Sequence, residues 1–318
     1  MGGWLTKALM ACGAEVVLLV RNAVPECLLA RDERLESLNR VYGSLADFSL
    51  LRRAFSEYSI KTVFHLAAQP LVGVAMRDPV GTLEANIQGT WHVLEAARLA
   101  GVEHVVVASS DKAYGAERHL PCLETHPLQG RFPYDVSKSC ADLISTMYAV
   151  TFGMRLGITR CANLFGGGDF NFSRMIPDLI RSTLRGERFV VRSDGKFVRD
   201  FLYVKDAVSA YLLLGERVWE DPELSGEAFN FGPEMPVQVL DLVHKVLEIM
   251  GRTDLEPVIQ NQARAEVREQ HLSSAKARRV LGWAPRYTLE EGLRETIDWY
   301  RKFLAEETAE SLAATSTP

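Results

Sequence analysis

Tyr134 and Lys138 are the two residues of this sequence whose types and spacing most clearly suit acid–base chemistry. On a helix, residues four apart lie on one face, one turn from each other. A lysine ammonium beside a phenol favours the phenolate and lowers the pKa of the phenol. A phenolate near neutral pH can take a proton from an alcohol, so the pair predicts a tyrosine base.

The sequence around this pair predicts a helix that runs from Ser137 to Phe152. Its apolar residues are Leu143, Ile144, Met147, Tyr148 and Val150. Gly153 supplies the expected C-terminal stop. A Tyr-x-x-x-Lys pair alone is more often a solvated helix face than a catalytic pair, so its chemistry depends on what the fold brings beside it.

A second polar cluster follows the apolar run 105–108, which predicts a buried strand. Ser109, Ser110, Asp111 and Lys112 leave this run at its carboxyl end. Open α/β sheets place ligands and chemistry at the carboxyl ends of their strands. The alternative for Asp111 and Lys112 is a solvated ion pair at a strand end.

Length and composition are those of a soluble globular enzyme. The chain has 318 residues, 47% hydrophobic and 24% charged, with a net charge of −5. This balance predicts one large or two modest domains and no nucleic-acid surface. The five scattered cysteines show no metal-ligand spacing, which predicts reduced thiols, no metal site and a cytoplasmic protein. No apolar run reaches membrane-spanning length, so no membrane partner is expected.

Seven segments, in order along nearly the whole chain, resemble those of a known enzyme family. They are residues 63–70, 86–90, 109–112, 134–138, 163–169, 199–201 and 281–285. The family is the extended short-chain dehydrogenase/reductases, in the sugar-nucleotide epimerase/dehydratase group. Within that group the chain is most similar to the 4,6-dehydratases of nucleotide hexoses, especially those of the CDP-glucose type.

The resemblance implies an α/β fold: a doubly wound, Rossmann-like parallel sheet with a smaller C-terminal substrate lobe. It implies NAD as cofactor and a sugar nucleotide as substrate. It also implies a homodimer, in which the helix over 82–100 and the helix carrying Tyr134 form a four-helix bundle across a two-fold axis. We expect a dinucleotide-binding domain over 1–165, with returning segments near 200–232. The remaining expected parts are a substrate lobe over 166–304 and a frayed tail over 305–318.

The resemblance implies a role for each residue of the two polar clusters. Tyr134 takes the proton from the sugar hydroxyl at carbon 4, and Ser110 donates to the same oxygen. Lys138 lowers the pKa of the tyrosine and binds the cofactor ribose. Asp111 and Lys112 are the acid and base that remove water across carbons 5 and 6. If Lys112 is the base it must be neutral, which requires burial or a nearby cation.

The resemblance also assigns residues to the two ligands. The cofactor residues are Gly2, Arg21, Leu45, Leu66, Ala67, Ala68, Asn86, Ser109, Tyr134 and Lys138. The substrate residues are Gln69, Asn163, Arg174, Arg199 and Arg264. Arg199 matches a position that clamps the nucleotide diphosphate, which suits the planar fork of a guanidinium. Arg21 stands where NAD enzymes usually carry an acid, so it either faces the extra phosphate of NADP or lies in solvent.

The start of the chain departs from the family pattern. Residues 1–9 predict a helix leaving a glycine turn, but the usual preceding strand is absent and Gly2 is the one glycine that matches. Losing that central strand uncovers about five apolar side chains, each worth roughly 1.5–3 kcal/mol of burial. We therefore expect the intact protein to begin upstream of Met1. The alternative is that these 318 residues are the whole product, with weakened dinucleotide binding.

Further elements follow from periodicity and turn residues. The predicted helices span 50–58, 237–250 and 289–304, and the predicted strands span 15–20, 62–66, 156–160 and 229–232. Two rival functions stay open. A 4-epimerase would use the same tyrosine and cofactor but usually has small apolar residues in place of Asp111 and Lys112. A non-catalytic, cofactor-poor relative would bind a sugar nucleotide or a partner.

Overall fold

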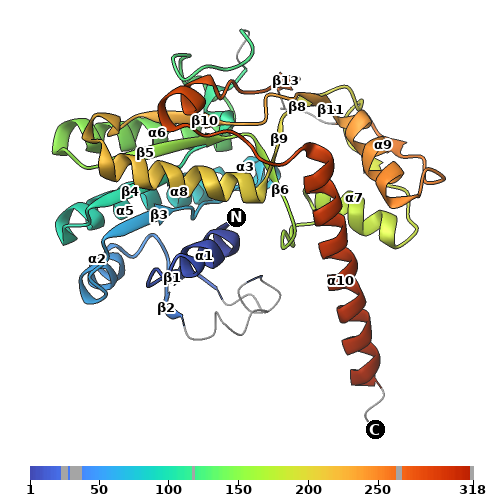
Figure 1. Ribbon diagram of the computed structural model, residues 1–318, viewed down its shortest axis with the longest axis horizontal. Helices are drawn as coiled ribbons and strands as arrows, with labels where there is room; N and C mark the ends of the chain where they lie inside the picture. Colours follow the sequence, from blue (N-terminus) through green and yellow to red (C-terminus); the bar gives the residue numbers. More distant parts are fainter. Residues whose placement is uncertain (23–27, 29–37, 117–118, 263–266, 316–318) are drawn as a thin grey trace.

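The computed structural model describes residues 1–22, 28, 38–116, 119–262 and 267–315. Its centre is a parallel four-stranded sheet with the strand order β10-β5-β4-β3 (Figure 1). The strands are β3 (Thr62–His65), β4 (His104–Ala108), β5 (Leu156–Cys161) and β10 (Ala228–Phe231). This architecture confirms the predicted α/β fold with a parallel sheet.

Strand β4 shows how both faces of this sheet are covered. Val106 packs into a cluster with Leu214 of α8 (Val204–Glu220). Val105 and Val107 point to the other face and pack with Leu94 of α5 (Gly89–Ala100). Successive side chains of a strand point to opposite faces, so a run of valines is buried on both sides. The helix α6 (Pro133–Phe152) covers the same face as α5.

A separate parallel pair joins β1 (Val17–Val20) to β2 (Asn39–Tyr42). In the described part of the chain, no strand bridges β1 and β3, so the predicted doubly wound sheet occurs as two hydrogen-bonded units. The helix α1 (Gly2–Ala11), predicted from the first residues, buries Leu5 in the cluster around α8. The strands β1 and β2 are only partly buried, in contrast to β4 and β5.

A second cluster of buried side chains lies in the C-terminal half. It packs α7 (Met175–Leu184), α9 (Val239–Met250) and α10 (Leu289–Thr315) together. A small sheet beside them has the order β11-β8-β13. Its strands are β11 (Val237–Gln238), β8 (Val198–Arg199) and β13 (Glu269–Gln270). Two more pairs are β6 (Asn163–Phe165) with β9 (Phe201–Tyr203) and β7 (Val190–Val191) with β12 (Val258–Ile259).

Most predicted helices are present, with shifted ends. Glycines in the left-handed conformation end two of them, Gly101 with φ 71° and Gly153 with φ 66°. The helix of Tyr134 begins at Pro133, four residues before the predicted start, since proline suits the first helical position. The remaining helices are α2 (Phe48–Glu57), α3 (Val72–Arg77) and α4 (Pro79–Leu83). None of the helices in the described residues is long and apolar enough to span a membrane.

Two local predictions are corrected. The helix expected over 82–100 is α4 and α5 joined by one π-helical turn at Glu84–Gln88. The helix expected from Val237 begins at Val239, because the two preceding residues form β11. The helix α10 runs to Thr315, into the segment from residue 305 whose fraying stays a prediction. In Figure 1 this helix extends away from the central sheet. Residues 316–318 lie outside the described part.

Candidate active site

The carboxyl end of β4 carries the residues that the sequence assigned to catalysis. Ser109 and Ser110 leave the strand, and Asp111–Tyr114 form a short 3-10 helix. Ser110 caps this helix: its hydroxyl accepts from the Lys112 backbone N–H at 3.2 Å and donates to Asp111 Oδ1 at 2.9 Å. Ser139 of α6 donates to the Ala113 carbonyl at 2.9 Å, so the tyrosine helix is tied to the same turn.

Tyr134 and Lys138 both lie buried beside this turn. Burial raises the pKa of Tyr134 to about 12; a hydrogen bond with Ser110 opposes the rise, and the Asp111 carboxylate adds to it. Burial lowers the pKa of Lys138 to about 8, against the opposing charge of Asp142. The phenol therefore lies near the serine hydroxyl that the resemblance grouped with it.

One electrostatic prediction is corrected. The spacing of Tyr134 and Lys138 predicts a lowered pKa for the phenol, whereas desolvation of the phenol dominates and raises that pKa. The Lys138 ammonium donates instead to the Ala108 carbonyl at 2.7 Å. The positive charge of Lys138 also acts on His65. The pKa of His65 is lowered to about 3, mainly by burial and further by this charge.

Lys112 has a partner that the sequence analysis did not single out. Its ammonium donates to Gln270 Oε1 at 2.5 Å, and Gln270 Nε2 donates to the Asp111 carbonyl at 2.7 Å. Gln270 lies 158 residues further along the chain, on β13, so no local pattern could have indicated it. Only the packing of the C-terminal lobe against β4 brings it here.

Asp135 is a second site residue without a predicted role. It is buried at the start of α6, and burial raises the pKa of its carboxyl to about 6. The charge of Lys112 lowers this pKa and the charge of Asp111 raises it, so the carboxyl faces the acid–amine pair. Its type and place after Tyr134 were visible in the sequence, but its burial was not.

Several residues assigned to the cofactor come together along the carboxyl edge of the sheet. Leu66, Ala67 and Ala68 follow β3, which is paired with β4 at His65 and Val107. A Cβ built on Gly2 would lie 4.0 Å from Leu66 Cδ1, so the start of α1 also reaches this edge. The buried Ser109 hydroxyl has no hydrogen-bond partner among the described residues. An unpaired buried hydroxyl of this kind fits a polar group supplied by a ligand such as NAD.

Asn86 and Gln69, assigned to cofactor and substrate, are engaged within the protein. Asn86 Oδ1 accepts from the Gln69 backbone N–H at 2.7 Å, and its amide donates to the Gln69 carbonyl and to Ser137 Oγ. The Gln69 side chain donates to the Leu71 carbonyl and to Thr82 Oγ1. Both side chains hold the loop after β3 to the helices, which shapes the edge where a ligand would lie.

Arg21 and Leu45 lie on the side of the two-stranded sheet. Arg21 is exposed directly after β1, and both alternatives for it, contact with an NADP phosphate or solvation, stay predictions. The carbonyl of Leu45 is hydrogen-bonded to His92 Nδ1 at 2.8 Å, which ties the loop after β2 to α5. The predicted adenosine side is thus less buried than the catalytic side.

The predicted substrate residues Asn163, Arg174 and Arg199 line one cavity of about 210 Å³. Arg199 is buried and donates to the carbonyls of Val198 and Arg268 at 2.8 and 3.0 Å, and also to that of Val267. Arg174 pairs with Asp169 at 2.9 Å and also affects the pKa of Tyr134. The cavity therefore lies near the catalytic phenol. Arg264 falls outside the described residues.

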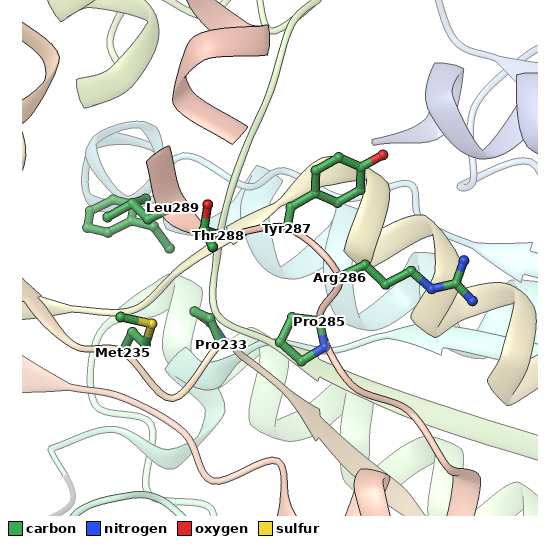
Figure 2. Close-up of a pocket in the computed structure, with 8 residues that line it drawn as sticks. Pro233, Met235, Pro285, Arg286, Tyr287, Thr288 and Leu289 are labelled. Carbon is green, nitrogen blue, oxygen red and sulfur yellow. The ribbon is translucent and has the colours of Figure 1, made fainter. Parts of the chain in front are cut away.

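A second cavity, of about 160 Å³, lies on the other side of Phe201, which lines both. Its wall is formed by Pro233 and Met235 and by the segment 285–289 (Figure 2). These side chains are mainly apolar. The described residues contain no cluster suited to a metal ion.

The model of the NAD dependent epimerase/dehydratase family matches residues 1–232, and the chain belongs to this family. The CDP-glucose 4,6-dehydratase of Salmonella typhimurium is 30% identical. The alignment covers 95% of this chain and 88% of that one. Two solved structures are also similar. UDP-glucose 4-epimerase from Thermotoga maritima with UDP-glucose has a TM-score of 0.85 at 29% identity, covering 95% and 96% of the two chains. DesIV, a dTDP-glucose 4,6-dehydratase from Streptomyces venezuelae with NAD bound, has a TM-score of 0.84 at 26% identity, covering 95% and 94%.

These comparisons confirm the resemblance read from the seven sequence segments. The relatives are NAD-dependent enzymes acting on nucleotide sugars, and both dehydratases and an epimerase are among them. The family assignment therefore supports an enzyme that acts on nucleotide sugars.

Proposed function

We propose that this protein is an NAD-dependent nucleotide-sugar 4,6-dehydratase, acting on CDP-glucose or a close relative to form a 4-keto-6-deoxy sugar. The observation that carries the proposal is the grouping of Asp111 and Lys112 with Ser110 and Tyr134 at the carboxyl end of β4. An epimerase needs the tyrosine and serine. The acid–amine pair is required for loss of water.

Ser110 and Tyr134 hold the sugar hydroxyl at carbon 4. The Ser110 hydroxyl acts on the pKa of the Tyr134 phenol, so the two hydroxyls lie near each other, where both can face a substrate oxygen. NAD, when bound, supplies the acceptor for the hydride of carbon 4. Tyr134 takes the hydroxyl proton as a phenolate, so the phenol must first lose its own proton. The positive charge of the Lys138 ammonium, now on the Ala108 carbonyl in the same buried region, would stabilise that phenolate.

Asp111 and Lys112 carry the elimination. The ketone at carbon 4 acidifies the hydrogen on carbon 5, and neutral Lys112 takes that proton. Asp111 passes a proton to the hydroxyl of carbon 6, which leaves as water while the double bond between carbons 5 and 6 forms. Lys112 would return its proton to carbon 5, and NAD, when bound, would supply the hydride that carbon 6 gains, which gives the 4-keto-6-deoxy product.

The cavity around Arg199 is the proposed site of the nucleotide diphosphate. Arg174 and Arg199 supply positive charge and Asn163 supplies an amide on its wall. Ser109 and the loop of Leu66 are the proposed neighbours of NAD. We take NAD over NADP because DesIV is solved with NAD bound and the matching family model is that of NAD-dependent enzymes, and Arg21 is the residue that tests this choice.

We also propose a homodimer formed through α5 and α6. These two helices expose large apolar side chains: Trp91, Leu99, Leu143, Met147, Val150 and Phe152. Exposed apolar side chains gathered on adjoining helices are typical of an interface. The absence of disulfides among the four described cysteines supports the proposed cytoplasmic location.

The deciding experiment incubates the purified protein and NAD with CDP-, dTDP- and UDP-glucose and analyses the products by mass spectrometry. Loss of one water with a 4-keto group supports the dehydratase. An epimerised sugar without loss of water would support the alternative that the similarity to UDP-glucose 4-epimerase favours. Sugar-nucleotide binding without any product would support the non-catalytic relative.

A further inference from the structure

Gln270 contacts both members of the acid–amine pair from a strand of the substrate lobe. We propose that it is a positioning residue for the elimination, holding the Lys112 amine over carbon 5 and linking it to the strand pair that lines the nucleotide cavity. The inference rests on the proposed dehydratase function and names a residue for one step of it.

The first support is the two-point attachment of the Gln270 carboxamide. Its oxygen accepts from Lys112 Nζ at 2.5 Å and its nitrogen donates to the Asp111 carbonyl at 2.7 Å. The residue is 1% exposed, so water does not compete for these bonds. If the carboxamide rotated away, it would lose a partner and leave a buried polar group unsatisfied, which is costly. The two hydrogen bonds therefore fix the orientation of the Gln270 side chain.

The second support is the chemical type of the partner. A carboxamide oxygen accepts a hydrogen bond from an amine in either protonation state, because it carries no charge of its own. A carboxylate in the same place would strongly favour the ammonium form. A base at position 112 must lose its proton before it acts, so a neutral acceptor suits this task.

The third support is the position of Gln270 on β13. It pairs in register with Arg199 of β8, and Arg199 donates to the carbonyls of Val267 and Arg268 just before it. The arginine that lines the nucleotide cavity therefore holds the strand that holds Lys112. Arg199 would bind the diphosphate end of the substrate, and Gln270, its partner on the neighbouring strand, would position Lys112 at the sugar end.

Other charged groups also face this pair and contribute to its titration. Asp135 of α6 faces Lys112 and Asp111. Asp200, between β8 and β9, faces Asp111 and His271, and Glu269 pairs with His271 at 3.3 Å. These groups are unchanged when Gln270 is replaced, so a comparison of variants at position 270 isolates its own effect.

The experiment compares Gln270→Glu, Gln270→Ala and the unaltered enzyme in steady-state assays across pH. Glutamate has nearly the same shape as glutamine, but its negative charge would favour the ammonium form of Lys112. The pH at which kcat rises should therefore increase by about one to two pH units. Alanine should lower kcat about 10- to 100-fold with little change in KM. In both variants the absorbance of reduced nicotinamide should persist during turnover, because oxidation precedes the slowed elimination.

Gln238→Glu is the matched control. Gln238 is exposed on β11, which pairs with β8 on the edge opposite to β13. The Gln238→Glu substitution therefore adds the same charge to the same small sheet, on a strand that does not contact Lys112 through Gln270. Its pH profile should superimpose on that of the unaltered enzyme. A Gln270→Glu profile that also superimposes, at equal thermal stability, would overturn the proposal.

A second measurement keeps this inference separate from the proposed function. The pH dependence of acetic anhydride labelling at Lys112, followed by peptide mass spectrometry, reports the pKa of the amine without any substrate. We expect Gln270→Glu to shift this labelling curve to higher pH and Gln238→Glu to leave it unchanged. Identical curves would refute the control of Lys112 by Gln270, whereas a shifted curve without dehydratase activity would refute only the proposed reaction.

Discussion

The catalytic cluster at the end of β4 and the cavity around Arg199 differ in how their polar groups are held. Tyr134 and Lys138 are nine-tenths or more buried, and main-chain carbonyls or neighbouring hydroxyls orient them. In the cavity, Arg199 is likewise buried on main-chain carbonyls, but Arg192 is exposed and the Arg174 side chain is 39% exposed. Acid–base chemistry benefits from desolvated, fixed groups, whereas recognition of a charged ligand can use hydrated arginines. Changes in the cluster should therefore alter kcat, and changes in the cavity should alter KM.

The largest effect is expected for Tyr134→Phe, which removes the proposed proton acceptor but keeps the ring. We expect kcat to fall roughly 100- to 10,000-fold, with KM little changed. Steady-state assays and a thermal unfolding curve check this. A variant that keeps more than a tenth of the activity would remove Tyr134 from the mechanism and erase the contrast between the two regions.

Lys112→Met separates the two halves of the reaction. The thioether keeps the length of the side chain but cannot take a proton, so elimination should slow about 100-fold while oxidation at carbon 4 continues. Persistent absorbance of reduced nicotinamide is the expected signature. The control is Lys61→Met, at an exposed lysine paired with Glu103 at the opposite end of the sheet, which should behave as the unaltered protein.

Arg199→Met tests the cavity. Loss of a charge-assisted contact to the diphosphate, worth about 1.5–3 kcal/mol, should raise KM about 10- to 100-fold. Because Arg199 also donates to the carbonyls that precede Gln270, kcat should fall as well, and a thermal unfolding curve checks that the lobe stays folded. Calorimetric titration with CDP measures the same loss without turnover. Arg188→Met changes an exposed arginine that bonds the Glu256 carbonyl and should leave binding intact. Equal binding by both variants would place the diphosphate elsewhere.

Burial in the cluster also predicts a pH dependence of stability. The pKa values of Asp135 and Asp200 are raised from 3.8 to about 6, so the folded protein keeps these protons to higher pH than the unfolded chain. The contribution of these groups to the free energy of unfolding must then fall as pH rises from about 4 to 6. Asp135→Asn should reduce this fall by about 1–3 kcal/mol in urea unfolding at the two pH values. An unchanged fall would show that Asp135 is not desolvated.

The smallest effect is expected for Arg21→Ala. This exposed residue follows β1 on the less buried adenosine side. If it lies in solvent, affinities for NAD and NADP should change by less than about 1 kcal/mol. A selective loss of NADP binding would instead assign it to the extra phosphate and make this side a specificity determinant.

Much of the fold was predictable because its signals are local. The valine run of β4, the glycines that end α5 and α6, and the Tyr134–Lys138 spacing all depend on near neighbours in the chain. The start of β11 before α9 was not predicted, because its pairing with β8 joins segments far apart in the chain.

The sequence by itself determined the elements, the family and the residue types available for chemistry, since these depend on periodicity and motifs. Only the tertiary structure decided which groups share a site and in what environment. It placed Gln270 on Lys112 across 158 residues, and it raised the pKa of Tyr134 where spacing alone predicted a fall. The physical reason is that desolvation depends on every element packed around a group, and those contacts come from parts of the chain that no local pattern connects.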